Sequence, residues 1–113
     1  PDVEGTVKHA QFTLGKQVFM AMDSSLSHQF IFNEAISLVV ECENQDEIDY
    51  YWDKLSAVPE AEQCGWLKDQ FGISWQIVPQ ILKQLMSDPA KSERVINAFM
   101  KMKKFDIAKL LDA

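Results

Sequence analysis

The sequence has few of the residues that mark several specialised classes of protein. Only two of its 113 residues are cysteine, too few for the disulfide framework of a small secreted domain. Its purely apolar runs are a few residues long, far short of the ~20 residues that span a bilayer. No charged and then apolar leader of the secretory type opens the sequence. We therefore expect a cytoplasmic protein with no membrane role.

Positive charge is also scarce. The chain carries 11 lysines and arginines against 17 aspartates and glutamates, a formal net charge of -6. Nucleic-acid binding draws on clustered basic side chains, so we expect no nucleic-acid partner. The one basic concentration, Lys101, Lys103 and Lys104, we interpret as the solvated face of a helix.

Apolar residues are plentiful, at 47% of the chain, which is enough for the core of one small domain. Alternation of apolar and polar residues predicts an antiparallel hairpin from the strands 5–14 and 18–22. The strongest strand pattern covers residues 35–42. A helix follows it, with Asn44 as its cap and Glu47 completing a capping box.

The second half of the chain repeats this order of signals. Residues 64–68 and 73–78 predict another hairpin, and Pro79 suits the first turn of a helix. Val95, Ile96, Phe99 and Met100 define a further helix, followed by a last helix that Asp106 caps. The two hairpins resemble each other, so we expect two copies of one unit, the first lacking its opening strand, helix and strand in this sequence. Chance similarity between two hairpins is the alternative.

Five segments together are similar to a known family: GTVKHAQFTLGKQVFMAMDS, FNEAISLVVEC, NQDEIDYYWDKLS, CGWLKDQFGISWQIVP and MKMKKFDIAKL. They resemble the PhnB-like, or 3-demethylubiquinone-9 3-methyltransferase-like, branch of the vicinal-oxygen-chelate (glyoxalase/bleomycin-resistance) superfamily. The resemblance implies an α+β fold in which paired βαβββ modules curve a mixed sheet around a cavity. Residues 1–32 would be the remainder of an incomplete first module, 33–79 the second module and 80–113 C-terminal helices. It also implies a homodimer.

The metal ligands of the superfamily have no counterparts among the matching positions. Gln76 stands where the last strand usually carries a glutamate, Ala35 where a histidine is usual, and Met20 at the equivalent position of the first hairpin. Amide, methyl and thioether groups are poor or impossible ligands for Mg²⁺ or Mn²⁺. We therefore predict no metal at these positions and no cofactor.

The resemblance places a set of largely uncharged side chains inside the cavity. We predict that they hold a small organic molecule by apolar contact and one amide, although ordinary packing explains them equally well. The predicted ligand-binding residues are Met20, Met22, Ser37, Val39, Ser74 and Gln76.

Nothing else in the sequence indicates a reaction. His9 and His28 have no partner at triad spacing, and we interpret Cys42 and Cys64 as inert thiols on strands. The four glycines are dispersed, so no loop for S-adenosylmethionine is indicated, and the methyltransferase label is unsupported. Whether the protein is an enzyme stays open. The alternatives to ligand binding are a structural or interaction role as a dimer and, by fold analogy alone, antibiotic sequestration.

Overall fold

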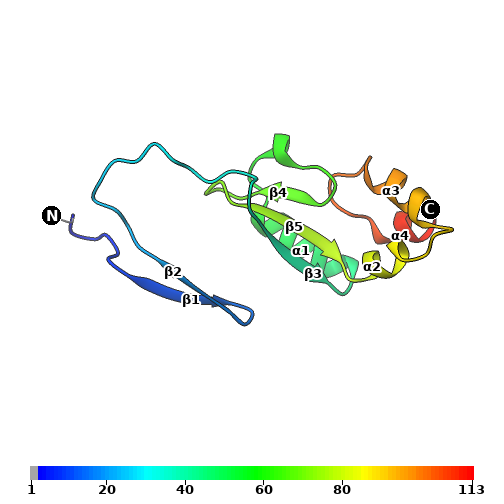
Figure 1. Cartoon of the computed structure of the whole chain (residues 1–113), viewed down its shortest axis with the longest axis horizontal. Helices are drawn as coiled ribbons and strands as arrows, with labels where there is room; N and C mark the ends of the chain where they lie inside the picture. The colour runs from blue at the N-terminus through cyan, green and yellow to red at the C-terminus, as the bar shows by residue number, and fades with distance from the viewer. Residues whose placement is uncertain (1–2) are drawn as a thin grey trace. The chain divides into compact units, whose positions relative to one another are not determined.

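The computed structural model describes residues 3–113 of the chain. The chain divides between residues 30 and 31 into two compact units, and each unit is described by itself (Figure 1). Within the described residues no helix is long and apolar enough to cross a membrane.

The first unit contains the predicted hairpin. Strands β1 (Ala10–Leu14) and β2 (Gln17–Ala21) pair antiparallel, so the hairpin is confirmed, with a shorter first strand than the pattern indicated and a second strand shifted by one residue. Phe12 and Phe19 face each other in the register, and their rings stack with centroids 5.6 Å apart. No described residue of this unit is buried, although an isolated two-stranded hairpin is only marginally stable in water.

The second unit is built on a three-stranded mixed sheet. Its strands are β3 (Ser37–Cys42), β4 (Trp66–Lys68) and β5 (Ser74–Pro79), in the spatial order β3-β5-β4. The predicted hairpin of β4 and β5 is confirmed as antiparallel, and β3 runs parallel to β5. The strand with the strongest sequence pattern, β3, is an edge strand of this sheet, and β5 lies in the middle and pairs on both sides.

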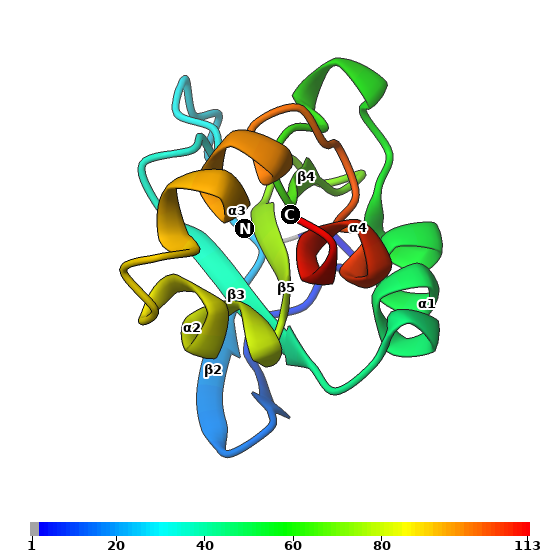
Figure 2. The ribbon, with the colours of Figure 1, turned by 90° about the vertical axis from the view of Figure 1, so that its right-hand side faces the viewer.

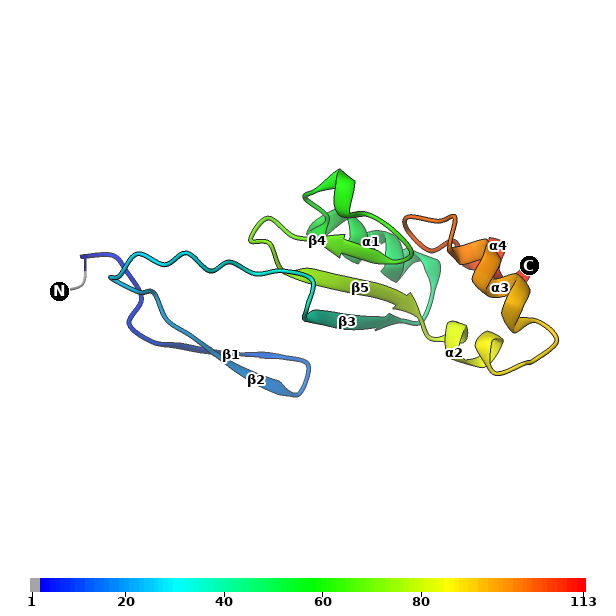
Figure 3. The ribbon, with the colours of Figure 1, turned by 45° about the horizontal axis from the view of Figure 1, so that its top comes forward.

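Helix α1 (Gln45–Leu55) forms the crossover from β3 and covers one face of this sheet (Figure 3). Asn44 caps it as predicted, since its side-chain oxygen accepts the Glu47 N–H at 2.9 Å. The capping box is not closed as expected, because the Glu47 carboxylate accepts a long 3.5 Å bond from the N–H of Glu43 instead of the cap residue. Ile48 is fully buried beneath the helix, which fixes its apolar stripe against the strands.

Three short helices gather beyond the C-terminal end of β5 (Figures 1 and 3). They are α2 (Ile81–Met86), α3 (Ser92–Phe99) and α4 (Ile107–Leu111), and the single turn η1 (Pro59–Ala61) lies against β4. Asp106 caps α4 as predicted, by accepting the Lys109 N–H at 3.2 Å. Pro79 does not open α2. It is the last residue of β5 and lies opposite Cys42, because the parallel pairing of β3 with β5 continues to that residue.

The core of the second unit joins α1, the sheet and the C-terminal helices, which surround the end of β5 in Figure 2. The last third of the chain differs from the sequence pattern in two places. The helix defined by Val95 and Phe99 is present, but it ends at Phe99, and both Ile96 and Met100 are exposed. The three lysines lie in the loop between α3 and α4 and not on a helix. The buried apolar residues are Cys42, Ile48, Leu67, Ile77, Leu85, Val95, Phe105 and Leu110.

Candidate functional site

Four of the six predicted ligand-binding residues lie together on the sheet face opposite α1. In the parallel register Ser37 pairs with Ser74 and Val39 pairs with Gln76, while Ile77 is fully buried on the α1 side. Adjacent residues in register point to the same face of a sheet. The Gln76 side-chain amide donates from Nε2 to Ser37 Oγ at 2.9 Å, which joins the central and edge strands on this face.

Strand β4 adds two residues that the sequence interpretation missed. Trp66 lies opposite Gln76 and Lys68 opposite Ser74 in the antiparallel register. Trp66 is half-buried at this position. The missing signal was the register: with the turn of residues 69–73 fixed, alternation puts Trp66 and Lys68 on the side of Gln76. We call the surface formed by these six residues the Gln76 face: Ser37, Val39, Trp66, Lys68, Ser74 and Gln76.

The turn that sets this register is held by one buried carboxylate. Asp69 accepts the backbone N–H groups of Phe71 and Ile73 at 2.8 and 3.0 Å. Its other oxygen accepts the indole N–H of Trp75 at 2.9 Å. Because both oxygens of its carboxylate accept hydrogen bonds, Asp69 stabilises the hairpin and fixes which side chains of β5 reach the Gln76 face.

A pocket of about 410 Å³ adjoins the Gln76 face beside β4. Trp66, Lys68 and Ser74 supply its sheet side, and Glu34, Gln63 and the η1 turn complete its rim. Its size falls within the ordinary range for small-molecule sites. The pocket therefore brings an aromatic ring, an ammonium and a hydroxyl to one hollow.

One ion pair stands at this pocket. Lys68 Nζ lies 3.1 Å from Glu34 Oε2, and the lysine is the less exposed of the two. The hydrogen bond from Lys68, together with a backbone hydrogen bond and the lysine charge, lowers the pKa of Glu34 below its ordinary value. Glu34 is therefore ionised at neutral pH, and because it is exposed it can move aside at little cost when another anion approaches Lys68.

The two predicted methionines belong to the first unit. Met20 lies in β2 opposite Gln11 and is 67% exposed, and Met22 follows directly after the strand and is 74% exposed. Both have apolar side chains available for contact. That they share a cavity with Gln76 stays a prediction.

The groups required for metal binding do not come together in the part of the chain that the structure describes. Among residues 3–113 no group of three or more His, Cys, Asp or Glu side chains is placed to hold an ion. His28 instead shares a 2.8 Å hydrogen bond with Ser24 and stacks on Phe30. Of the positions that the sequence analysis tested for metal ligands, Ala35 has no donor atom in its side chain and the amide of Gln76 is bonded to Ser37.

A methyl donor of the S-adenosylmethionine type does not fit the parallel strand-to-helix turn. That turn, between β3 and α1, contains no glycine and carries the acidic side chains of Glu43 and Glu47. The backbone N–H of Glu47 donates to the side-chain oxygen of Asn44, so it is not available to a ligand. The space beside Gly65 is filled by the ring of Phe105. At these two places in the described residues, the backbone therefore lacks the glycine-rich turn that holds such a group.

Neither cysteine lies where a nucleophile is needed. Cys42 is fully buried at the end of β3, and burial, with a smaller contribution from the Glu47 charge, raises the pKa of its thiol to about 11. Cys64 was expected on a strand, which was wrong: it occupies the turn before β4 with a φ of 52°. A Cys42 thiol that stays protonated at neutral pH is inert.

Together the mixed sheet, the single crossover helix and a site on an open sheet face define an α+β protein whose candidate site is made by strands. Comparison with known proteins then gives the family. The family model for 3-demethylubiquinone-9 3-methyltransferase matches residues 1–78. A PhnB protein from Bacillus cereus, whose structure carries the same description, is 42% identical, with a TM-score of 0.58 over 68% of this chain and 67% of that chain.

The chain belongs to this PhnB-like, 3-demethylubiquinone-9 3-methyltransferase-like family, as its motifs predicted. The search of curated proteins finds none that matches it. The α+β class is confirmed by the strands and helices of the structure and by the similar PhnB structure.

Proposed function

We propose that this chain binds a small organic molecule on the Gln76 face, without the metal ligands usual in the vicinal-oxygen-chelate superfamily. The observation that carries the proposal is the bond from Gln76 to Ser37, which holds the amide across two strands. Because Nε2 is used as a donor, the amide oxygen stays available to accept a hydrogen bond from a ligand. The Trp66 ring and the adjoining pocket supply apolar contact.

Lys68 narrows the chemistry of the proposed ligand. Its ammonium is partly buried beside an exposed partner, so a carboxylate or another oxygen acceptor of the ligand can replace Glu34. A molecule with a flat apolar part and one acidic oxygen group meets Trp66 and Lys68 together. Catalysis is not part of this proposal, because the face offers no general base positioned beside a nucleophile.

The test is a thermal-shift screen of small aromatic and aliphatic carboxylates, followed by titration of the best ligand. We expect Gln76→Leu and Lys68→Met to weaken its binding by roughly tenfold each, the loss of one hydrogen bond to a charged or polar group. Gln84→Leu, an exposed glutamine of α2, is the matched control. A ligand that binds both variants as tightly as the parent chain would count against the Gln76 face.

A metal arm belongs in the same experiment. Mg²⁺, Mn²⁺, Ni²⁺ and Zn²⁺ are added singly, and we expect none to raise the melting temperature through the Gln76 face. Stabilisation by one of these ions that Gln76→Leu abolishes would contradict the metal-free proposal.

The second candidate function is a structural or interaction role as a homodimer. The first unit favours it, because its apolar side chains are exposed although a hairpin of two strands needs further burial. Light scattering tests it: we expect twice the mass of one chain, and a monomer at micromolar concentration would contradict it. The exposed apolar residues of the first unit include Phe12, Leu14, Val18, Met20, Met22, Leu26 and Phe30.

We also propose a cytoplasmic location, since both cysteines are unpaired.

A further inference from the structure

The loop between α3 and α4 carries an unusual density of positive charge for an acidic chain. Lys101, Lys103 and Lys104 lie in this loop and Lys109 lies in α4, so four of the chain's 11 basic residues fall within nine positions. All four line a depression of about 520 Å³, together with Gln45 and Asp49 of α1 and Asp106. We call this depression the lysine pocket.

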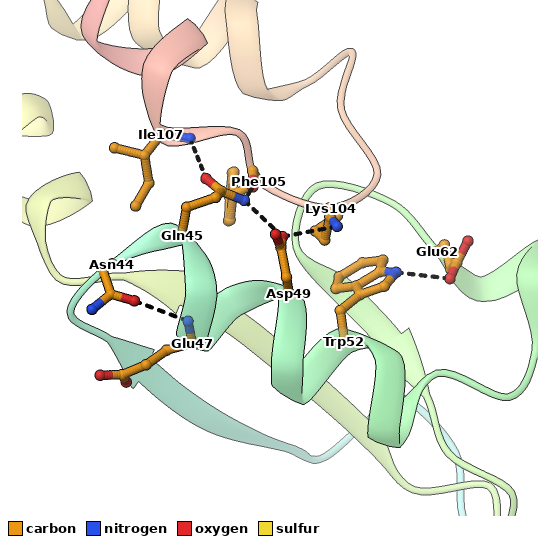
Figure 4. Close-up of polar contacts among 9 residues, drawn as sticks. All are labelled: Asn44, Gln45, Glu47, Asp49, Trp52, Glu62, Lys104, Phe105 and Ile107. Atoms are coloured by element: carbon orange, nitrogen blue, oxygen red, sulfur yellow. Dashed lines mark hydrogen bonds and ion pairs between the residues drawn. The ribbon is translucent and has the colours of Figure 1, made fainter.

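The backbone of this loop is held in place from two sides. The N–H groups of Cys64 and Gly65 donate to the carbonyls of Met102 and Lys103, both at 2.8 Å. From α1, the Gln45 amide donates to the Phe105 carbonyl at 2.9 Å and accepts the Ile107 N–H at 2.8 Å (Figure 4). The stems of the lysines therefore start from fixed positions, which reduces the entropy lost when their ammonium groups converge on a ligand.

The acidic groups of the lysine pocket are already engaged. Asp49 lies 2.8 Å from Lys104 and also accepts from Gln45, as Figure 4 shows, and Asp106 accepts the backbone N–H of Lys109. Within the described part of the chain, Lys101, Lys103 and Lys109 have no carboxylate within 4.0 Å. Three unpaired ammonium groups thus border one hollow, and a polyvalent anion placed there would offset their mutual repulsion.

We propose that the lysine pocket binds a compact anion of the phosphate or pyrophosphate class, either free or as part of a small phosphorylated molecule. Lysine ammonium groups are common phosphate ligands, acting as point charges. The pocket shares no residue with the Gln76 face, so this site stands or falls independently of the function proposed above. It also lies largely outside residues 1–78, the part matched by the family model.

The test compares sodium pyrophosphate and orthophosphate with sodium chloride at equal ionic strength. Binding is measured by isothermal titration calorimetry and by the melting temperature of the chain. The first variant is Lys101→Gln/Lys103→Gln/Lys109→Gln, and the matched control is Lys16→Gln/Lys83→Gln/Lys91→Gln, three exposed lysines outside the pocket. Both variants change the net charge equally, so only position distinguishes them.

We expect pyrophosphate to bind the parent chain and the control variant alike, and the pocket variant roughly tenfold more weakly, from three partly screened charge contacts. Binding that is absent in the parent chain, or weakened equally in both variants, would overturn the proposal. An added arm uses vesicles of anionic phospholipid. Binding to the vesicles without any response to pyrophosphate would show that the lysines recognise a membrane surface, and would overturn it as well.

Discussion

The ring of Phe105 lies directly against the backbone of Gly65. A Cβ atom on Gly65 would fall 2.9 Å from Cδ2 of that ring and closer still to Cε2, and the residue has a φ of +84°. Phe105 is buried in the core and is held there through its carbonyl by Gln45. The start of β4 and the loop before α4 can therefore approach each other only while this position has no side chain.

Gly65→Ala should consequently destabilise the second unit strongly. We expect a loss of about 3 kcal/mol in the free energy of unfolding, from overpacking and a left-handed backbone together. Urea denaturation followed by tryptophan fluorescence measures it. Gly72→Ala is the matched control, with a φ of +89° but no atom closer than 3.8 Å, so it should cost only about 1 kcal/mol for the backbone. Equal losses in the two variants would contradict a special contact at Phe105.

Gln45 is expected to stabilise the fold through both the nitrogen and the oxygen of its side-chain amide. Gln45→Ala leaves the Phe105 carbonyl and the Ile107 N–H without their partner, which should cost about 1–3 kcal/mol. The stability of Gln45→Glu should fall between those of the parent chain and Gln45→Ala. A carboxylate still accepts the Ile107 N–H, but it cannot donate to the Phe105 carbonyl and it stands near the charge of Asp49. Gln84→Ala on α2 should change little. Denaturant titration ranks the three, and a Gln45→Ala variant as stable as Gln84→Ala would refute the contribution.

Asp49 should make the free energy of unfolding depend on pH in the acidic range. The hydrogen bond from Lys104, then the one from Gln45, lowers the pKa of this carboxyl from the ordinary 3.8. A group with a lowered folded pKa stabilises the protein above its unfolded pKa, and the contribution is lost as pH falls through the folded value. Asp49→Asn should therefore be less stable than the parent chain at pH 7, by less than about 1 kcal/mol because the pair is exposed.

This difference should begin to shrink as pH falls below 3.8 and should vanish only below the lowered folded pKa, where the parent carboxyl is protonated in the folded state as well. Thermal unfolding between pH 2.5 and 7, roughly the range that spans carboxyl titration, measures it. Asp53→Asn, an exposed position on the same helix, is the control and should show no such convergence. A parent-to-variant difference that stays constant down to the lowest pH would contradict the pairing.

The two cysteines should differ in reactivity. Burial holds the pKa of Cys42 at about 11, whereas Cys64 is partly exposed in its turn. The thiolate is the reactive form of a cysteine. At pH 7.5, roughly one unit below the pKa of a free thiol, a disulfide reagent should therefore modify one thiol per native chain. The second should react only in denaturant. Cys64→Ser should remove the native reaction, and two thiols reacting at one rate in the native chain would refute the assignment.

Local patterns in the sequence predicted what depends on neighbours along the chain. Asn44 lies directly before a periodic apolar stripe, and the two hairpins have their turns at Gly15 and Gly72, so cap and hairpins could be placed. The cap and the hairpins rest on periods of two and 3.6 residues. The family resemblance, and not alternation within single strands, grouped Ser37 with Gln76, and the structure joins their side chains by a hydrogen bond.

Features that join distant segments could not be predicted this way. Gln45 reaches residues 60 and 62 positions away, and no pattern around it indicates such a partner. The position of β5 between β3 and β4 is likewise a long-range choice. Lys101 and its neighbours follow an apolar run that continued the helical period, but α3 ends at Phe99 and the loop bonds instead to Cys64 and Gly65. Tertiary contacts here override local propensity.

The central position of β5 also governs how the backbone opens. Its amides are bonded to partners on both edges, including the bond from Ile77 N–H to the Gly65 carbonyl at 2.8 Å, so water reaches all of them only after both edges have separated. In deuterated solvent, protons on Ile77 and its neighbours should persist until whole molecules unfold. Those of the hairpin at residues 10–21 should be replaced early, through local fraying.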